Sequence, residues 1–271
     1  MSRSYLFIPG NTPSMIQNLD VFESDSVIID FEDSVINYDK DAARILINNF
    51  LNKFSFKEFE IYIRINDALN SNFLKDVEAT IDLDITGYVL PKASIDAINK
   101  LNTLIKDKKV IPIIESPLAL LKAEEIAQCQ NVSGLLLGAE DYTKELGITR
   151  TLKGTEILYA RSYIAIICNA YGIEAIDTPY TLKDDEVGLK EDSINSKNLG
   201  FTGKSLIHPN QVDIVNDVFS PSSSEIFEAK RIIKKSEETN KGAFSLDGKM
   251  IDLPIIEKAK KVLEKAKKYN L

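Results

Sequence analysis

The sequence predicts an α/β protein, a closed (β/α)8 or TIM barrel with a C-terminal helical extension. Eight apolar segments of strand length alternate with segments of helical periodicity, and the connections between them are short. Doubly wound sheets usually contain fewer strands, so the eight repeats favour closure into a barrel. Several of the predicted strands end on a polar or ionisable residue. In a parallel barrel these ends meet at one face, where catalytic groups lie.

The predicted strands are short apolar runs, most of them bounded by glycine, proline or polar residues. In chain order they are Tyr5–Ile8, Val27–Phe31, Ile61–Ile65, Tyr88–Leu90, Val110–Ile114, Gly134–Leu137, Glu174–Ile176 and Lys204–Ile207.

The predicted helices carry recognisable end signals. Thr12 and Ser94 are candidate N-caps, Pro13 and Pro117 occupy first helical positions, and Gly172 follows the end of a helix. The predicted helices are Pro13–Phe22, Asp39–Leu51, Leu74–Ile81, 94–105, Pro117–Ala127, Gly154–Tyr171, Asp184–Leu199 and Asn210–Val218.

The chain after Pro221 is not needed to close the barrel. Pro221 and the three serines after it resemble a linker. A charged helix over Glu225–Thr239, a glycine-containing turn and a basic amphipathic helix from Pro254 follow. This segment must pack on the barrel or on a neighbour. We expect a catalytic barrel domain over residues 1–220 and a C-terminal helical lid over residues 221–271 that packs on a neighbouring subunit.

Composition excludes several classes of protein. The net charge of −8 repels polyanions and argues against nucleic-acid binding. Cys129 and Cys168 lack the spacing of a zinc site or a CxxC motif, so we expect free thiols in a reducing compartment. The N-terminal apolar segment is too short for a signal peptide, and no apolar run approaches membrane-spanning length. These features predict a cytoplasmic protein with no membrane partner.

Two carboxylates, Glu115 and Asp141, end the fifth and sixth predicted strands. Neighbouring strands lie about 4.8 Å apart, so the two side chains can share one cation. Two carboxylates together with water and substrate oxygens are typical of a Mg²⁺ site. Alternatively, the two residues are N-caps of the helices that follow, an interpretation that suits Asp141 better than Glu115. Spacing alone leaves both interpretations open.

Arg64 lies within a predicted strand, and a strand arginine that faces a barrel interior must be paired. Its planar fork suits a carboxylate, either that of a substrate or, in an internal ion pair, that of Glu32 or Asp33. Glu32 and Asp33 are consecutive, so only one can point inward from a regular strand. One of them can be functional while the other caps a helix.

Three further residues stand at strand boundaries. Lys92 follows the fourth predicted strand and Lys204 begins the eighth. Either can form a Schiff base if buried, although a lysine in this position is more often exposed to solvent. His208, the only histidine, can cap a helix or support a neighbouring group, but it cannot complete a His-rich zinc site. The sequence lacks Walker, GxGxxG and GxSxG motifs.

Eight ordered motifs run from Arg3 to the C-terminal helix: RSYLFIPGN, IIDFEDSV, IYIRIN, VLPKA, IPIIESPLAL, GAEDYTKELG, FTGKSLIHPNQ and GAFSLDGKMIDLP. Together they resemble the citrate lyase β-subunit-like family, which belongs with the malyl-CoA and citramalyl-CoA lyases. The resemblance implies a (β/α)8 barrel that binds Mg²⁺ and assembles as a trimer or hexamer.

The resemblance also implies residue roles. It makes Glu115 and Asp141 the metal ligands, and it makes Arg64 the group that binds the substrate carboxylate. Asp252, in GKMID, would reach the site of a neighbouring subunit as proton donor or acceptor. Glu32 and Asp33 would lie near the metal, and Lys92 would neighbour the site. The implied catalytic residues are Asp252, Arg64, Glu32 and Asp33, and the implied substrate-binding residues are Arg64, Glu115 and Lys92.

The resemblance implies a Mg²⁺-dependent carbon–carbon lyase that cleaves a β-hydroxyacyl thioester by retro-Claisen chemistry. The substrate would be a citramalyl, malyl or citryl thioester of coenzyme A or of an acyl carrier protein, and the products an acetyl thioester and a keto acid. Two other functions remain open. One is a class II-type aldolase acting on free keto acids, which would not need the Asp252 segment. The other is a non-catalytic scaffold, or the β chain of a larger citrate lyase complex.

Overall fold

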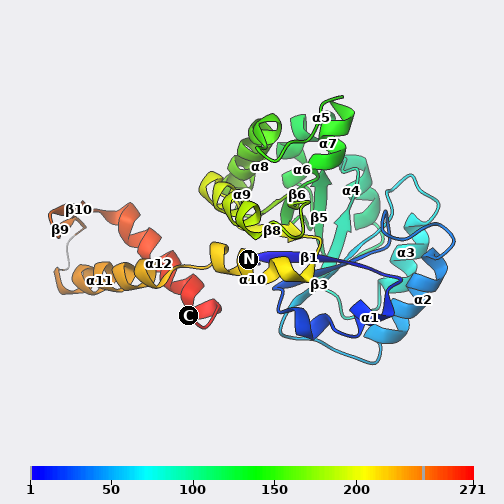
Figure 1. Cartoon of the computed structure of the whole chain (residues 1–271), viewed down its shortest axis with the longest axis horizontal. Helices are drawn as coiled ribbons and strands as arrows, with labels where there is room; N and C mark the ends of the chain where they lie inside the picture. The colour runs from blue at the N-terminus through cyan, green and yellow to red at the C-terminus, as the bar shows by residue number, and fades with distance from the viewer. Residues whose placement is uncertain (1, 240–241) are drawn as a thin grey trace. The chain divides into compact units, whose positions relative to one another are not determined.

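The computed structural model describes residues 2–239 and 242–271, and eight parallel strands form a closed barrel (Figure 1). The strands follow one another in chain order, and β8 pairs with β1 to close the barrel. This confirms the predicted (β/α)8 architecture. The strands are β1 Ser4–Pro9, β2 Ser26–Asp30, β3 Glu60–Arg64, β4 Gly87–Leu90, β5 Lys109–Ile114, β6 Gly134–Leu137, β7 Glu174–Asp177 and β8 Gly203–Leu206.

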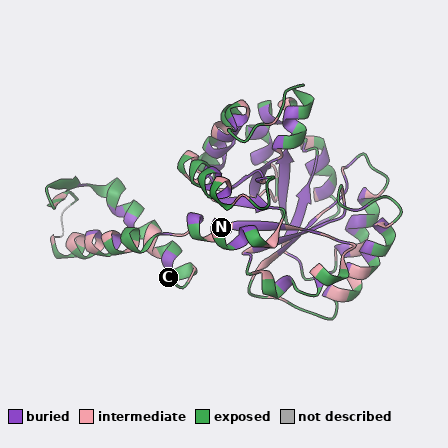
Figure 2. Ribbon diagram, in the orientation of Figure 1, coloured by how far each residue is buried: buried purple, intermediate pink, exposed green. Residues whose placement is uncertain are grey.

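Alternate strand residues fill the barrel interior. Figure 2 shows the strands buried and the outer faces of the surrounding helices exposed. Because side chains alternate, the residue two positions after a core residue faces the interior again, nearer the C-terminal end of its strand. The core cluster comprises Tyr5, Ile28, Tyr62, Val89, Ile111, Ile113, Leu136 and Ile176, with Phe7 packed against it.

The helices of the barrel unit differ from prediction at several places, and the helix over Ala139–Glu145 was not among those predicted. The segment expected as one helix over Pro13–Phe22 is interrupted at Asn18, whose Nδ2 donates to the main-chain oxygen of Ser14 at 2.6 Å and so competes with helical hydrogen bonding. The expected helix over Pro117–Ala127 is also in two pieces. The barrel-unit helices are α1 Pro13–Ile16, η1 Leu19–Phe22, α2 Lys40–Leu51, α3 Phe73–Thr80, α4 Ile95–Asn102, α5 Pro117–Leu121, α6 Ala123–Ala127, α7 Ala139–Glu145, η2 Thr155–Ile157, α8 Leu158–Tyr171, α9 Glu186–Leu199, η3 Pro209–Gln211 and α10 Val212–Phe219.

A second compact unit begins at Asp217, within α10. Two long helices of this unit bury an apolar cluster that includes Ala229, Ile232 and Ile256. The unit also contains a hairpin that was not predicted, in which Asp247 and Gly248 have φ values of +50° and +79°, as a tight two-residue turn requires. The elements are α11 Ser223–Thr239, β9 Phe244–Leu246, β10 Lys249–Ile251 and α12 Leu253–Lys268.

Across the described residues, none of the helices combines the length and the apolar character that crossing a bilayer requires.

Candidate active site

The candidate site residues lie at the C-terminal ends of the strands whose core residues fill the barrel. Every second residue of a strand faces the barrel interior, so the residue two positions after a core residue faces it as well. At the C-terminal ends of four strands, this residue is polar. This brings side chains from four strands to one mouth of the barrel. The polar residues reached in this way are Asp30, Arg64, Glu115 and Thr178, which follow Ile28, Tyr62, Ile113 and Ile176.

Two adjoining cavities lie at this mouth. The first, of about 470 Å³, has an apolar lining that includes Phe7 and Leu136. The second has a volume of about 770 Å³ and a more polar lining. The cavities share Asp33, Glu115 and Asp141, while Arg64 lines the first, and Glu32 and Lys92 line the second. The structure therefore brings together the site residues that were predicted within the barrel.

Arg64 is held by a carboxylate that the sequence analysis did not single out. Its Nε and Nη2 donate to Oδ1 and Oδ2 of Asp30 at 2.6 and 2.7 Å. Its Nη1 lies 3.0 Å from Glu32 Oε2 and 3.8 Å from Asp33 Oδ2. The internal ion pair left open by the sequence is therefore present, with Asp30 as the bidentate partner. Strand alternation could have identified Asp30, because it lies two residues after the core residue Ile28.

The Asp30–Arg64 pair stays charged. Burial alone would raise the pKa of Asp30, but the hydrogen bonds and positive charge of Arg64 hold this pKa below its usual value. The guanidinium also lies over the ring of Phe7, with Cζ 5.1 Å from the ring centroid. Arg64 is therefore fixed on two sides, and its Nη1 is directed at Glu32.

Glu32 is fixed through its main chain. Lys40, which is 4% exposed, donates from Nζ to the main-chain oxygens of Phe31 and Glu32 at 2.7 and 2.8 Å. Oδ1 of Asp30 accepts from the main-chain nitrogen of Glu32 at 2.8 Å. The loop after β2 is thus anchored by two buried charged side chains, and this defines where Glu32 enters the site.

Glu115 follows β5 and is 8% exposed. Its Oε1 accepts from the main-chain nitrogen of Lys92 at 2.5 Å, and Lys92 adopts a positive φ of +48°. A Cβ at Gly138 would lie only 2.6 Å from Cβ of Glu115, so glycine is needed beside it. Ser116 is the N-cap of α5, where its Oγ accepts from Ala119 at 3.0 Å. The N-cap interpretation of Glu115 is therefore wrong.

Asp141 is the third residue of α7, whose N-cap position is occupied by Gly138. The N-cap interpretation is therefore wrong for Asp141 as well. Its side chain is 49% exposed and lies 3.5 Å from Lys144 Nζ. A carboxylate in the first turn of a helix is favoured by the helix dipole, and this one faces both cavities.

Negative charge is in excess around the two buried glutamates. Burial raises the pKa of Glu32 to about 8, and the charge of Asp33 adds to this effect against the opposing influence of Arg64. Burial likewise raises the pKa of Glu115 to about 7, with a contribution from Asp141. Both acids therefore bind protons near neutral pH, and a bound cation would stabilise their charged forms.

The donor set suits a hard cation. In the described part of the chain, no group of three or more His, Cys, Asp or Glu side chains is arranged to hold a metal ion. Glu115 and Asp141 nevertheless line the same two cavities, so they can supply two carboxylates while water or substrate oxygens complete the coordination. Oxygen ligands of this kind fit Mg²⁺ better than zinc, which prefers nitrogen and sulfur.

The contacts of the other residues at strand boundaries are with neighbouring parts of the protein. The Lys92 side chain is 66% exposed and lies 3.2 Å from Asp67 Oδ2. Lys204 is fully buried and ion-paired, so it is neither solvent-exposed nor free to attack a carbonyl group. His208 caps η3, with Nδ1 accepting from the main-chain nitrogen of Asn210 at 3.2 Å. The capping alternative therefore describes His208.

Asp252 belongs to the C-terminal unit. It is the N-cap of α12, and its Oδ1 accepts from the main-chain nitrogen of Ile255 at 3.4 Å. The catalytic role implied for Asp252 by the resemblance stays a prediction.

Known proteins of similar sequence are lyase subunits and lyases. The chain is 37% identical to the citrate lyase subunit beta of Haemophilus influenzae, over 98% of this chain and 97% of that protein. It is 32% identical to the human mitochondrial citramalyl-CoA lyase, over 95% of this chain and 83% of that protein. Both alignments extend beyond the barrel unit, as the motifs in the sequence predicted.

Solved structures show the same architecture. The CitE protein of Mycobacterium tuberculosis in complex with magnesium, acetoacetate and coenzyme A matches with a TM-score of 0.84 at 28% identity, covering 98% of both chains. RipC from Yersinia pestis matches with a TM-score of 0.72 at 30% identity, covering 83% of this chain and 98% of that chain. The family model for HpcH/HpaI aldolase/citrate lyase matches residues 3–209. The predicted citrate lyase β-subunit-like relationship is confirmed, and the chain belongs to the HpcH/HpaI aldolase/citrate lyase family.

Proposed function

We propose that this chain is a Mg²⁺-dependent carbon–carbon lyase that cleaves a β-hydroxyacyl thioester into an acetyl thioester and a keto acid. The observation that carries the proposal is the convergence of Glu115, Asp141 and Arg64 on one cavity at the C-terminal mouth of the barrel. The acyl group would be of the citramalyl, malyl or citryl type. The coenzyme A bound to the mycobacterial relative supports a thioester substrate.

The metal would be held by Glu115 and Asp141. Glu115 is buried, its pKa is raised to about 7, and its neighbour Asp141 is also a carboxylate, so this position favours an added positive charge. When bound, Mg²⁺ would act as a Lewis acid toward the developing carbonyl oxygen and lower the pKa of the substrate hydroxyl. The magnesium in the structures of the mycobacterial relative supports this assignment.

Arg64 would bind the carboxylate of the keto-acid portion. Asp30 already occupies its Nε and Nη2, so the substrate would approach the Nη1 side, where Glu32 lies 3.0 Å away. A fixed guanidinium orients the carboxylate without further ordering of the side chain. Lys92 would contribute positive charge at the rim of the neighbouring cavity.

Retro-Claisen cleavage breaks one carbon–carbon bond. The hydroxyl group loses its proton as it becomes the keto group, and the enolate carbon of the leaving acetyl thioester gains one. Glu32 would accept the hydroxyl proton when its carboxylate is charged, because a pKa raised by burial to about 8 makes it a stronger base than an exposed carboxylate, and Asp33 lies beside it at the cavity. Asp252 would be the acid that protonates the enolate carbon.

Asp252 would act from a neighbouring subunit of a homo-oligomer, a trimer or a hexamer. The lid formed by residues 221–271 would bring it over the metal site of the neighbour. An Asp252→Asn chain keeps an intact metal site, and an Asp141→Ala chain keeps an intact lid. Each should be inactive alone, and mixed oligomers should regain part of the activity. Confirmed subunit exchange without recovery would contradict action between subunits.

The decisive assay for the function is a panel of thioesters. Citramalyl-CoA, malyl-CoA and citryl-CoA are each supplied with Mg²⁺, and the keto acid released is identified as pyruvate, glyoxylate or oxaloacetate. Activity on at least one thioester, lost in excess chelator, is the expected result. Cleavage of free hydroxy keto acids, with no turnover of any thioester, would instead support the aldolase alternative.

A second candidate is the β chain of a citrate lyase complex. The 37% identity to a citrate lyase β subunit over nearly the full length of both proteins favours it. In that case the thioester would be carried by an acyl carrier protein. Turnover of citryl groups on a carrier protein, with little turnover of the corresponding coenzyme A thioester, would distinguish this role.

A further inference from the structure

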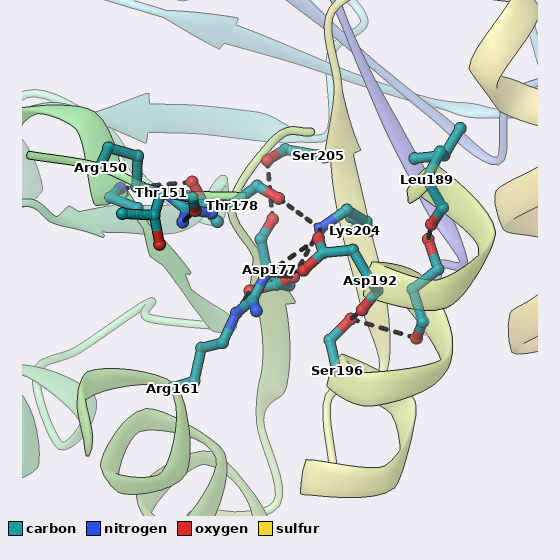
Figure 3. Close-up of polar contacts among 12 residues, drawn as sticks. Arg150, Thr151, Arg161, Asp177, Thr178, Leu189, Asp192, Ser196, Lys204 and Ser205 are labelled. Atoms are coloured by element: carbon teal, nitrogen blue, oxygen red, sulfur yellow. Dashed lines mark hydrogen bonds and ion pairs between the residues drawn. The ribbon is translucent and has the colours of Figure 1, made fainter. Parts of the chain in front are cut away.

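Four buried charged side chains form a closed ring on the outer side of β7 and β8 (Figure 3). Asp177 and Lys204 are opposite each other in the register of these two strands. Asp177 alternates with the core residue Ile176, so it faces the surrounding helices. Arg161 of α8 and Asp192 of α9 complete the ring, and all four side chains are at most 6% exposed.

Positive and negative charges alternate around this ring. Arg161 Nε and Nη2 donate to Oδ1 and Oδ2 of Asp177, both at 2.9 Å, and Nη2 donates to Asp192 at 2.8 Å. Lys204 Nζ donates to Asp177 Oδ2 at 2.6 Å and to Asp192 Oδ2 at 2.7 Å. Burial would raise the pKa of Asp177, but Lys204 and Arg161 hold this pKa below its usual value.

A buried ion-pair ring is weak evidence for stability, since well-packed apolar side chains can often replace one without loss. The third hydrogen bond of Lys204 indicates a different role. Nζ donates to the main-chain oxygen of Thr178 at 2.7 Å. An ammonium group has three N–H donors, and here all three have an acceptor. The ring therefore fixes the end of β7 from outside the barrel.

Thr178 and the following Pro179 belong to the wall of the 470 Å³ cavity. Oγ1 of Thr178 accepts from the main-chain nitrogen of Ala139 at 3.3 Å. Ala139 begins α7, the helix that carries Asp141. The contacts thus run from Lys204 through Thr178 to the helix of one proposed metal ligand.

The other end of this wall segment is held separately. Nε2 of Gln211 donates to the main-chain oxygen of Tyr180 at 2.9 Å. Loss of the Lys204 hydrogen bond should therefore release Thr178 and Pro179 locally while leaving Tyr180 in place.

We propose that Lys204 is a positioning residue: from outside the barrel it holds the Thr178–Pro179 wall of the cavity and, through Thr178, the start of α7. The expected effect of Lys204 on turnover rests on the proposed function. The expected effect of Lys204 on the cavity wall rests on the contacts alone. A shift of about 1 Å at a reacting centre can lower turnover by about 10²-fold, so a hydrogen bond outside the cavity can affect the reaction.

The test uses two double variants with the same balance of charge. Lys204→Met with Asp192→Asn removes the hydrogen bond to Thr178 and leaves Arg161 paired with Asp177. The control, Arg161→Met with Asp192→Asn, removes the same carboxylate and one cation but leaves Lys204 bonded to Asp177 and Thr178. If the ring serves stability alone, the two variants should behave alike.

Two measurements are made on each full-length variant, well below its melting temperature. Hydrogen exchange across residues 175–182 should increase in the Lys204 variant and stay near wild type in the control. Turnover of the thioester that wild type cleaves should fall by about ten- to a hundredfold in kcat in the Lys204 variant. The control should remain within about threefold of wild type.

The outcomes separate this inference from the proposed function. Equal exchange in the two variants overturns the positioning role whether or not any thioester is cleaved. Increased exchange with no thioester turnover by wild type keeps the positioning role and contradicts the proposed function.

If the first variant does not fold, Lys204→Met with Asp177→Asn removes the same hydrogen bond and leaves Arg161 paired with Asp192. Failure of both to fold, with a folded control, would make Lys204 a folding residue and overturn the proposal.

Discussion

Two charged clusters lie near the C-terminal ends of the strands, and they balance negative charge differently. In the ring behind β7 and β8, Asp177 and Asp192 each contact both Arg161 and Lys204. At the cavity, carboxylates that follow β2 and β5 or lie on α7 share few cations, and the pKa values of two glutamates are raised. The contrast teaches that paired cations hold the pKa of a buried carboxyl group down, as at Asp177, whereas an excess of carboxylates leaves the pKa values of Glu32 and Glu115 raised, which is what a site that binds a cation or a proton requires.

The largest effect should come from removing a proposed metal ligand. We expect Glu115→Ala or Asp141→Ala to lower metal-dependent turnover by about 10³-fold or more, because a Lewis acid contributes several kcal/mol to transition-state stabilisation. Circular dichroism should be unchanged, since neither residue forms part of the apolar core cluster of the barrel. Full activity in excess chelator would show that the uncompensated carboxylates serve some purpose other than holding a metal.

The second effect concerns stability, and its size differs between the clusters. Lys204→Met alone leaves two buried aspartates with one cation, so we expect the free energy of unfolding to fall by about 3–5 kcal/mol. Glu115→Gln removes a charge that burial disfavours, so the metal-free protein should lose no stability. Urea titrations of both variants in chelator measure these changes. A comparable loss in both would break the distinction between the two clusters.

Arg64 tests the cation that lies beside Glu32 in this cluster. Arg64→Lys keeps the charge but cannot form both the bidentate contact with Asp30 and the contact near Glu32. We expect kcat/KM to fall by about 10²-fold. Calorimetry should show weaker binding of the keto acid and unchanged binding of coenzyme A. Near-normal kinetics would reduce Arg64 to an internal ion-pair partner.

The barrel and the position of the candidate site at the strand ends could be predicted from the sequence, because both depend on local patterns. Strand-like runs predicted the eight strands, and their polar ends pointed to Glu115 and Arg64. Asp30 lies in the same motif as Glu32 and was missed, because its role appears only once the alternation from Ile28 is followed.

The ion-pair ring behind β7 and β8 could not be predicted from such local patterns. The pairing of Asp177 with Lys204 depends on the register of two strands, and that of Arg161 with Asp192 depends on the rotational phase of two helices. Neither the strand register nor the rotational phase of the helices can be derived from the spacing of residues along the chain. The sequence therefore suggested solvent exposure or a Schiff base for Lys204, whereas the structure shows a buried ion pair.

The smallest effect is a pH dependence confined to the uncompensated cluster. The native pKa of Glu32, about 8, lies above its ordinary value of 4.5, so the native state binds this proton more tightly than the unfolded chain. The resulting stability is present below the unfolded pKa and is lost as the pH rises toward 8. We expect a loss of at most about 1.4 kcal/mol for each pH unit in the metal-free protein across this window. Glu32→Gln should remove that loss.

Urea titrations of wild type and the Glu32→Gln variant in chelator, at several pH values across this window, measure the effect. The difference between the two proteins isolates Glu32, because other titrating groups contribute to both. The variant should match wild type at the acidic end and exceed it at the alkaline end, since glutamine carries no charge that burial disfavours. Added Mg²⁺ should narrow the difference by stabilising the charged carboxylates. A variant that is less stable than wild type at the alkaline end would mean that Arg64 already compensates Glu32, and the two clusters would then not differ at this residue.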